Sequence, residues 1–253
     1  MIRWLMAFLA FGLSPLAPVP AGAAECRNVT HKGNLYSICE IDTRKERLRL
    51  FLRDRQGQPY GEFETIDRSL RANGKALGFA MNAGMYHEDR APVGLYVEEG
   101  EEEMRLVTNP GPGNFGLLPN GVFCIAPDGR ARVIESLAFE EEAPECRYAT
   151  QSGPMLVIDG KLHPRFLPDS TSRYLRNGVG TSKDGSRVVF AISDNPVTFY
   201  EFGLFFRDFL DLPEALYFDG NVSRLYAPAI DRHDGGRTMG PVVGTVVRAP
   251  EGN

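Results

Sequence analysis

The 253-residue chain lacks any long run of basic residues, although charged residues are common in it. Lys and Arg number 28 against 33 Asp and Glu, which gives a formal net charge of −5 at pH 7. A mildly acidic protein without a basic cluster is repelled by a phosphate backbone. The composition therefore argues against a nucleic-acid partner, and any anionic substrate must be met by a local group of donors.

Common metal and nucleophile motifs are also missing. The four histidines are scattered, at His31, His87, His163 and His233. No Cys-x-x-Cys occurs either, so a zinc site is disfavoured and no cofactor is expected. Ser152 does not lie in a Gly-x-Ser-x-Gly elbow, which argues against a Ser-His-Asp hydrolase. One metal alternative is His87-Glu88-Asp89 together with Asp219, although this spacing fits no helical metal motif.

No stretch rich in Ser, Gly and Pro divides the chain, so the sequence predicts one domain over residues 25–253. Residues 1–24 are expected to be a signal peptide. One basic residue, Arg3, precedes an apolar stretch that is shorter than the roughly 20 residues needed to span a bilayer. The sequence therefore predicts an exported protein, periplasmic or secreted.

The small residues Ala21 and Ala23 suit a signal peptidase, which predicts cleavage after Ala23 or Ala24. An uncleaved membrane anchor is the alternative. A lipid-anchored start at Cys26 is disfavoured, because such processing needs a small residue just before the cysteine and Glu25 stands there. After cleavage, no stable membrane insertion is expected.

All four cysteines follow the expected cleavage site, at Cys26, Cys39, Cys124 and Cys146. Export places them where disulfides persist, and four cysteines allow three pairings. The pairs Cys26–Cys39 and Cys124–Cys146 are favoured, because each encloses a short segment that is typical of neighbouring strands or a hairpin.

Most of the chain is predicted to form short strands. Residues 34–53 suggest two strands joined by a polar turn, and residues 76–81 suggest a buried strand. Two hairpins are expected, at Asn120-Gly121 within residues 114–125 and at Asp159-Gly160. Other strands are expected at 94–97, 132–134, 148–151, 155–158 and 161–162.

The best helix is predicted over residues 198–211. Thr198 with Glu201 forms a capping box. An apolar stripe follows at helical spacing, formed by Phe199, Phe202, Phe206, Phe209 and Leu210. This stripe is expected to pack on a sheet. The predicted fold is therefore a single α+β domain, with a largely antiparallel multi-stranded sheet and a few packed helices.

Polar side chains follow apolar runs at several turns. The run Leu216-Tyr217-Phe218 ends in Asp219-Gly220, with Asn221 and Ser223 beyond it. A buried strand thus delivers a carboxylate to its end, where glycine allows a sharp turn. The alternative is that Asp219 only opens a turn by accepting a hydrogen bond from a nearby backbone N–H.

Three further corners have the same character. Residues 76–81 lead into Asn82 and Gly84, Gln151 and Ser152 precede Gly153, and Arg176 and Asn177 precede Gly178. Such donors suit a phosphate oxyanion or a sugar hydroxyl. The alternative for Arg176 is a surface or structural ion pair, and for Ser152 a turn hydroxyl. Asp194 is a further candidate carboxylate, although its neighbours are typical of a turn into a helix.

Five segments resemble, in the same order, motifs of the phosphodiester glycosidase family. They are Met81–Tyr86, Asn114-Phe115 with Pro119–Phe123, Thr150–Leu156, Arg176–Gly180 and Phe218–Ser223. The resemblance covers roughly residues 39–247 and is strongest to the exported bacterial branch. That family includes the enzyme that uncovers mannose 6-phosphate on lysosomal hydrolases by removing N-acetylglucosamine. One departure is Asn221, which follows Gly220 where the family often has a further glycine.

The resemblance implies a hydrolase that cleaves the bond between a sugar and a phosphodiester, with a carbohydrate or sugar-phosphate as substrate. The departing phosphate monoester is far more acidic than an alcohol, so donors that neutralise it can replace much of an acid's role. Arg176 is expected to do this, with Asn177 and Ser152 beside it. Asp219 is expected to act as nucleophile or as base for water.

Asn82 and Asn221 are expected to orient sugar hydroxyls. Further substrate contacts are expected from Gly84, Gln151, Gly153, Gly220 and Ser223. Two other functions stay open: a non-catalytic glycan- or envelope-binding module, and a metal-dependent phosphodiesterase.

Overall fold

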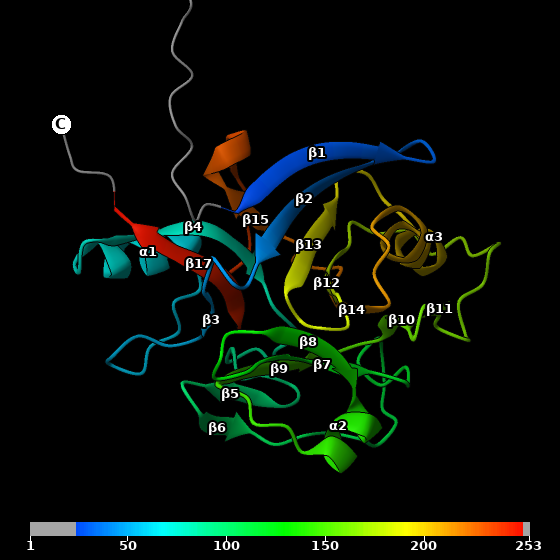
Figure 1. Ribbon diagram of the computed structural model, residues 1–253, viewed down its shortest axis with the longest axis horizontal. Helices are drawn as coiled ribbons and strands as arrows, with labels where there is room; N and C mark the ends of the chain where they lie inside the picture. Colours follow the sequence, from blue (N-terminus) through cyan, green and yellow to red (C-terminus); the bar gives the residue numbers. More distant parts are fainter. Residues whose placement is uncertain (1–23, 250–253) are drawn as a thin grey trace, which may run out of the picture.

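The computed structural model describes residues 24–249, whose strands form three antiparallel sheets (Figure 1). The first has the order β1 (Glu25–His31), β2 (Asn34–Asp42), β13 (Arg187–Ser193), β12 (Asn177–Thr181), β14 (Glu214–Asp219), β10 (Met155–Ile158) and β11 (Lys161–Leu162). The second has the order β16 (Arg232–His233), β15 (Leu225–Ala227), β4 (Lys75–Asn82), β17 (Val242–Arg248) and β3 (Leu48–Phe51). The third has the order β6 (Glu101–Met104), β5 (Tyr96–Glu98), β9 (Tyr148–Ser152), β7 (Gly121–Ile125) and β8 (Ala131–Glu135).

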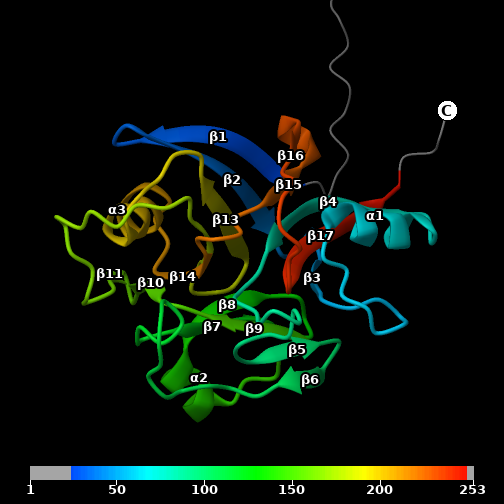
Figure 2. The same ribbon diagram turned by 180° about the vertical axis from the view of Figure 1, so that it is seen from behind.

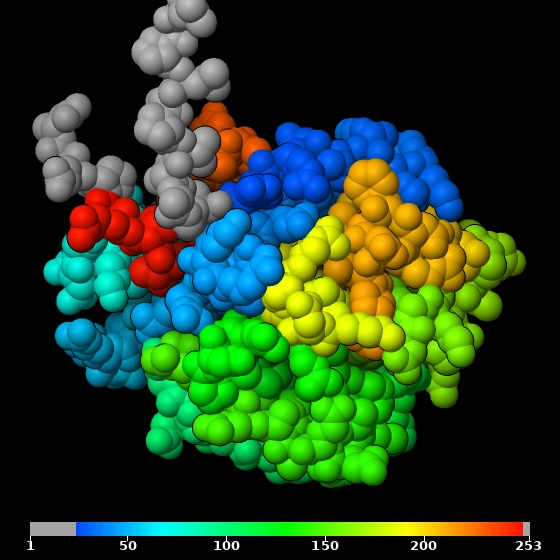
Figure 3. All heavy atoms as spheres, in the orientation of Figure 1, coloured from blue at the N-terminus to red at the C-terminus, as the bar shows by residue number. Residues whose placement is uncertain are grey.

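Short helices lie at the outside of the sheets. Helix α1 (Phe63–Arg71) packs on β4, α2 (Ser136–Glu142) packs on β7 and β8, and α3 (Phe199–Leu204) packs on β10 (Figures 1 and 2). In the space-filling view, the third sheet and its loops, in green, lie against the other two sheets (Figure 3). The prediction of a single α+β domain with largely antiparallel strands is confirmed, although the strands form three sheets and not one.

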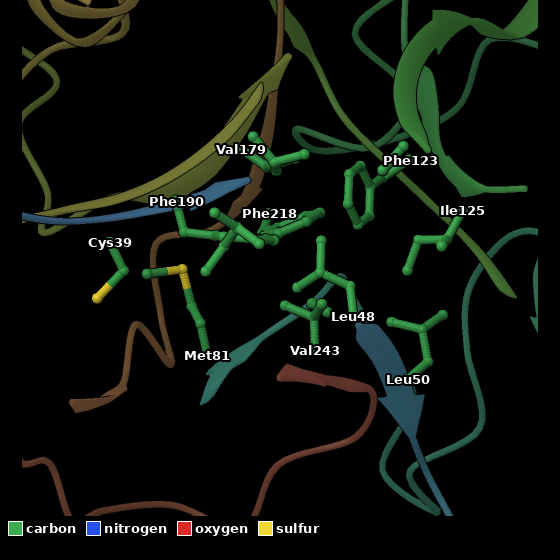
Figure 4. Close-up of a cluster of buried hydrophobic side chains, with 14 of the residues drawn as sticks. Cys39, Leu48, Leu50, Met81, Phe123, Ile125, Val179, Phe190, Phe218 and Val243 are labelled. Carbon is green, nitrogen blue, oxygen red and sulfur yellow. The ribbon is translucent and has the colours of Figure 1, made fainter. Parts of the chain in front are cut away.

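The main core lies where the three sheets meet. Figure 4 shows Phe218 and Phe190 of the first sheet beside Met81 and Val243 of the second and Phe123 of the third. Alternation along β14 explains this, because successive strand residues face opposite sides. Leu216 and Phe218 enter this core, whereas Ala215 and Tyr217 join a second cluster under α3.

The predicted capping box is present: Thr198 Oγ1 accepts a hydrogen bond from the Glu201 N–H, and the Glu201 carboxylate accepts one from the Thr198 N–H. The predicted continuous helix is only partly correct. It changes after Leu204 to a π-helical turn over Phe205–Phe209, where Leu210 N donates to Phe205 O. The wider turn shifts the buried face, so that Phe205 is buried and Phe209 is 42% exposed.

The hairpin predicted around Asn120-Gly121 is wrong. Residues 114–118 form a loop, and β7 begins only at Gly121. Asn120 is buried and donates to Phe115 O, so its side chain closes the loop instead of turning a hairpin. Strand β7 pairs with β8, across a turn at residues 127–129. The Asp159-Gly160 hairpin between β10 and β11 is confirmed.

Both predicted disulfides are confirmed. Cys26 and Cys39 are directly opposed on β1 and β2, and Cys124 of β7 is bonded to Cys146, which precedes β9. No free cysteine is present among residues 24–249. Across that same part of the chain, no helix is long and apolar enough to cross a membrane. The predicted signal peptide lies almost entirely outside the described residues.

Glu46, between β2 and β3, is a buried carboxyl at 8% exposure, and its Oε2 atom has no hydrogen-bond partner. Burial, together with the charges of Asp42 and Glu25, raises the pKa of Glu46 to about 7. The pKa in an unfolded chain is about 4.3. Protonated Glu46 therefore stabilises the fold at low pH, and this contribution is lost as the pH rises through about 7.

We expect Glu46→Gln, which mimics the protonated form, to unfold at higher urea concentration than the parent at pH 8 and at nearly the same concentration at pH 4. The gain at pH 8 should be about 1–3 kcal/mol. Glu64→Gln, on the exposed side of α1, is the control and should show no such pH dependence. An equal effect of Glu46→Gln at both pH values contradicts this assignment.

Candidate active site

The Asp219 turn stands at the end of a buried strand. Asp219 is the last residue of β14 and is opposite Asn177 of β12. Its Oδ1 accepts hydrogen bonds from the N–H groups of Gly220 and Asn221, the latter at 2.8 Å. Burial at 8% exposure raises the pKa of Asp219, and the backbone N–H groups oppose part of this rise. Asp219 therefore accepts the backbone hydrogen bonds of a turn, and it also presents its carboxylate to a cavity.

A cavity of about 760 Å³ opens beside this turn. Its walls come from five parts of the chain: Met85, Tyr86, Arg90, Val93; Pro112, Gly113, Asn114, Phe115; Ser172, Tyr174; Tyr217, Asp219, Gly220, Asn221, Val222; and Arg237, Thr238. Asp219 is the single carboxylate among these lining residues, and Arg90 and Arg237 are the two cations. The predicted site residues Gly220 and Asn221 are part of this wall.

Sequence reasoning missed Arg90 and Arg237. Within residues 24–249 neither forms an ion pair with a carboxylate, and Arg90 lies over the Tyr86 ring at 5.4 Å. Both arginines lower the pKa of Tyr86, which burial and the Asp219 charge raise, so all three charges are near that phenol. Arg237 follows Gly235-Gly236, so the rule of polar residues beside glycine would have found it.

Asn82 and Asn177 are fully buried and do not line the cavity. Asn177 Nδ2 donates to both Asn82 O and Asn82 Oδ1 at 3.0 Å, while its Oδ1 accepts from Asp219 N at 3.1 Å. Asn82 Oδ1 accepts from Arg224 N, and Ser223 Oγ donates to Asp219 O. These amides and Ser223 lie together with Asp219, but they support its turn from behind.

Gln151 and Ser152 are also buried behind the cavity wall. The Gln151 carboxamide is fully used, since it accepts from Leu95 N and Val107 N and donates to Val107 O and Ser136 Oγ. Ser152 Oγ donates to Phe218 O at 3.0 Å.

The two glycines predicted here serve close packing. A Cβ on Gly84 would lie 3.0 Å from Thr150 Oγ1, and one on Gly153 would lie 2.7 Å from Asn120 Cβ. Neither glycine is in the cavity wall. The geometry therefore places Gly84, Gln151, Ser152 and Gly153 in the support of the site and not in its lining.

Arg176 is buried at 1% exposure and makes no ion pair within residues 24–249, so the predicted alternative of a structural ion pair is wrong. Its guanidinium lies 3.6 Å above the Phe199 ring, donates to Val197 O and Ser172 O, and is not in the cavity wall. Arg176 therefore lies behind the cavity wall, where it does not face a bound substrate.

The remaining candidates are elsewhere. Asp194 forms an ion pair with Arg232 and a hydrogen bond with Ser37, outside the cavity wall. For the metal alternative, no group of three or more His, Cys, Asp or Glu side chains within residues 24–249 is arranged to hold an ion.

Gly220 is needed where it stands. Its backbone is outside the left-handed region, yet a Cβ there would overlap the Tyr217 hydroxyl and nothing else so closely. We expect Gly220→Ala to destabilise the fold by about 1–3 kcal/mol. The same change in a Tyr217→Phe background should cost much less, since the overlapping oxygen is gone. Denaturant unfolding of the four proteins in a double-mutant cycle measures this coupling, and equal costs in both backgrounds contradict it.

Comparison with known proteins supports one family. Over 219 residues the chain is 34% identical to the uncharacterized protein YigE of Escherichia coli (strain K12), covering 87% of this chain and 84% of that protein. The fold is similar to the catalytic domain of zebrafish N-acetylglucosamine-1-phosphodiester alpha-N-acetylglucosaminidase, with a TM-score of 0.57 and 12% identity over 89% of this chain and 86% of that one.

A hypothetical protein from Synechocystis has a similar fold, with a TM-score of 0.58 and 14% identity over 89% of this chain and 62% of that one. At such low identity these two structures establish the fold alone. The model of one family, phosphodiester glycosidase, matches residues 76–246, a segment that includes every cavity-lining residue. The chain belongs to the phosphodiester glycosidase family.

Proposed function

We propose that this protein is an exported hydrolase that cleaves the bond between a sugar and the phosphate of a sugar-1-phosphodiester. The observation that carries the proposal is the charge arrangement of the cavity. One buried carboxylate, Asp219, faces the same space as two arginines that have no carboxylate partner within residues 24–249. A phosphodiester is a monoanion that such cations can bind. A carboxylate can act at the sugar carbon as nucleophile or as base for water.

Arg90 and Arg237 take the role that sequence reasoning gave to Arg176. Their guanidinium groups can each offer two N–H donors to the phosphate oxygens. Because the departing group is a phosphate monoester, charge neutralisation by these arginines supplies much of what a second carboxylic acid supplies in other glycosidases. This fits a cavity wall that contains one carboxylate and not two.

Asp219 stabilises the oxocarbenium-like transition state, either as nucleophile or as base for water. The N–H groups of Gly220 and Asn221 fix its Oδ1 and hold its orientation. The rings of Tyr86, Phe115 and Tyr174 in the cavity wall suit the apolar face of a sugar, and the Asn221 amide suits its hydroxyls.

Export is supported by the apolar leader-like start of the sequence and by the two disulfides, which persist in oxidising compartments. Ala24 is buried in the main core, which favours processing after Ala23 over processing after Ala24.

Asp219→Asn is expected to lower kcat on the best sugar-1-phosphodiester by several orders of magnitude without changing the melting temperature. In the parent, kcat/KM should fall as the pH falls through the raised pKa of Asp219, because only the carboxylate is active. A panel of sugar-1-phosphodiesters, assayed with and without chelator, measures both. Parent-like turnover by folded Asp219→Asn contradicts the role, loss of activity with chelator points to the metal enzyme, and binding without turnover points to a glycan-binding module.

Arg90→Ala and Arg237→Ala should each lower kcat/KM by about 10–10³-fold. The loss should be smaller with a nitrophenyl phosphodiester, whose departing monoester is less basic and needs less charge neutralisation. Arg130→Ala is the matched control, because Arg130 is exposed and outside the cavity wall. An equal loss across leaving groups contradicts direct action on the phosphate.

A further inference from the structure

Tyr217 was not a predicted site residue, yet it shares the catalytic face of its strand. Tyr217 and Asp219 are two residues apart on β14, so their side chains lie on one face, opposite the buried Phe218. Both line the cavity. The Tyr217 hydroxyl lies beside Gly220, where a Cβ would overlap it. This places a phenol oxygen next to the Asp219 turn.

The Tyr217 hydroxyl is buried and makes no hydrogen bond within residues 24–249, although the side chains of Arg176 and Asn114 lie near enough to lower its pKa. Leaving a buried hydroxyl unpaired costs about 1–3 kcal/mol. Native structures seldom accept this cost without a use for the group. Burial also raises the pKa of Tyr217 well above its ordinary value, so the phenol stays protonated and can donate a hydrogen bond at any physiological pH.

Directly behind Tyr217 lies the Nη1 atom of Arg176, which likewise makes no hydrogen bond within the described part of the chain. The Arg176 guanidinium is held by the faces and edges of three rings, with Phe199 at 3.6 Å, Tyr174 at 5.4 Å and Tyr217 at 5.5 Å. Such contacts favour a cation, but they offset only part of the cost of burying one without a carboxylate. The charge of Arg176 acts on Tyr217, since it opposes the rise in the phenol's pKa.

The two unpaired groups are chemically complementary. Arginine offers only N–H donors, whereas a phenol both accepts and donates. If the Tyr217 oxygen faces the cation, its O–H remains free for an acceptor in the cavity, and the positive charge behind it strengthens that bond. An unpaired donor that lines a cavity beside the catalytic carboxylate is a place for a substrate oxygen.

We propose that Tyr217 is a catalytic residue of this site, which donates a hydrogen bond to the oxygen linking the sugar to phosphorus, and that Arg176 is a positioning residue that orients and polarises it. The inference rests on the proposed function. In the step, the bond between the sugar carbon and this oxygen breaks with its electron pair left on the oxygen, while a new bond forms from that carbon to the Asp219 carboxylate or to the water that Asp219 deprotonates. Tyr217 keeps its proton and stabilises the new negative charge.

The test is Tyr217→Phe, which removes the oxygen but keeps the ring beneath Arg176. We expect kcat on an alkyl sugar-1-phosphodiester to fall by about 10²–10³-fold, with a smaller loss on a nitrophenyl phosphodiester and an unchanged or higher melting temperature. Tyr36→Phe is the matched control. Its hydroxyl is also buried and unpaired, but it packs on Phe205 outside the cavity wall, so kcat should not change.

Arg176 is tested by the same readout. Arg176→Met should reproduce the leaving-group dependence of Tyr217→Phe, and the double variant should be no slower than Tyr217→Phe alone, because Arg176 acts through the phenol. If Arg176→Met does not fold, Arg176→Lys takes its place. Because lysine retains a cation, this variant should keep part of the parent rate. Additive losses would mean that Arg176 acts independently of Tyr217.

Failure of this inference can be told apart from failure of the proposed function. A parent-like rate in Tyr217→Phe, with Asp219→Asn inactive, overturns the inference and leaves the function intact. If the parent hydrolyses nothing in the panel, the proposed function fails. Calorimetric binding of glucose 1-phosphate then tests whether Tyr217 donates a hydrogen bond to the ligand. A tenfold or greater loss of affinity in Tyr217→Phe supports the donor, whereas equal affinity overturns it.

Discussion

The site depends on the pair of buried carboxamides formed by Asn82 and Asn177. Asn82 ends β4 in the second sheet, and Asn177 begins β12 in the first. Their mutual hydrogen bonds join the two sheets at the point where Asp219 leaves β14. Both residues are fully buried, so their polar groups must find hydrogen-bond partners within the protein. The Asp219 carboxylate is thus fixed by two sheets at once.

The same junction controls one of the arginines. Asn82 Oδ1 accepts from the backbone N–H of Arg224, whose buried guanidinium donates to the carbonyls of Asp234 and Arg237. An ion pair with Glu62 completes the neutralisation of Arg224. The loop that carries Arg237 into the cavity wall is therefore anchored to the residue that supports Asp219. Cation and carboxylate are positioned through one continuous set of hydrogen bonds.

Sequence reasoning named several residues that the fold places near Asp219, but it did not tell which of them line the cavity. Polar residues beside glycine mark the ends of strands, and strand ends converge in this fold. Asn82 and Asp219 end their strands and Asn177 begins one, so the three lie together. The rule does not tell which polar atoms face inward. Arg176 stands at such a corner, yet the rings around it hold it behind Tyr217, and that depends on tertiary packing. Arg90 lies in a polar stretch that is typical of an exposed turn, so no neighbouring residue indicated that it lines the cavity.

Patterns among neighbouring residues predicted some parts of the fold and not others. Alternating strands, both disulfides and the Thr198 capping box follow from neighbouring residues and were predictable. The π turn after Leu204 was not, because Phe205 is buried against Tyr36, 169 positions earlier in the chain. Likewise residues 114–118 have the pattern of a strand but form a loop, in which Asn114 and Phe115 line the cavity and Asn120 donates a hydrogen bond to Phe115 O.

The cavity wall is drawn from five separated parts of the chain, from Met85 to Thr238, and each part leaves a different strand end or loop. None of the five segments, whether released by a protease or grafted onto another scaffold, contains both the carboxylate and the two arginines. Loss of register in any one sheet removes part of the wall. Ligand affinity in this protein should therefore report on the integrity of the whole domain, and limited proteolysis at any of the five segments should abolish binding before most of the secondary structure is lost.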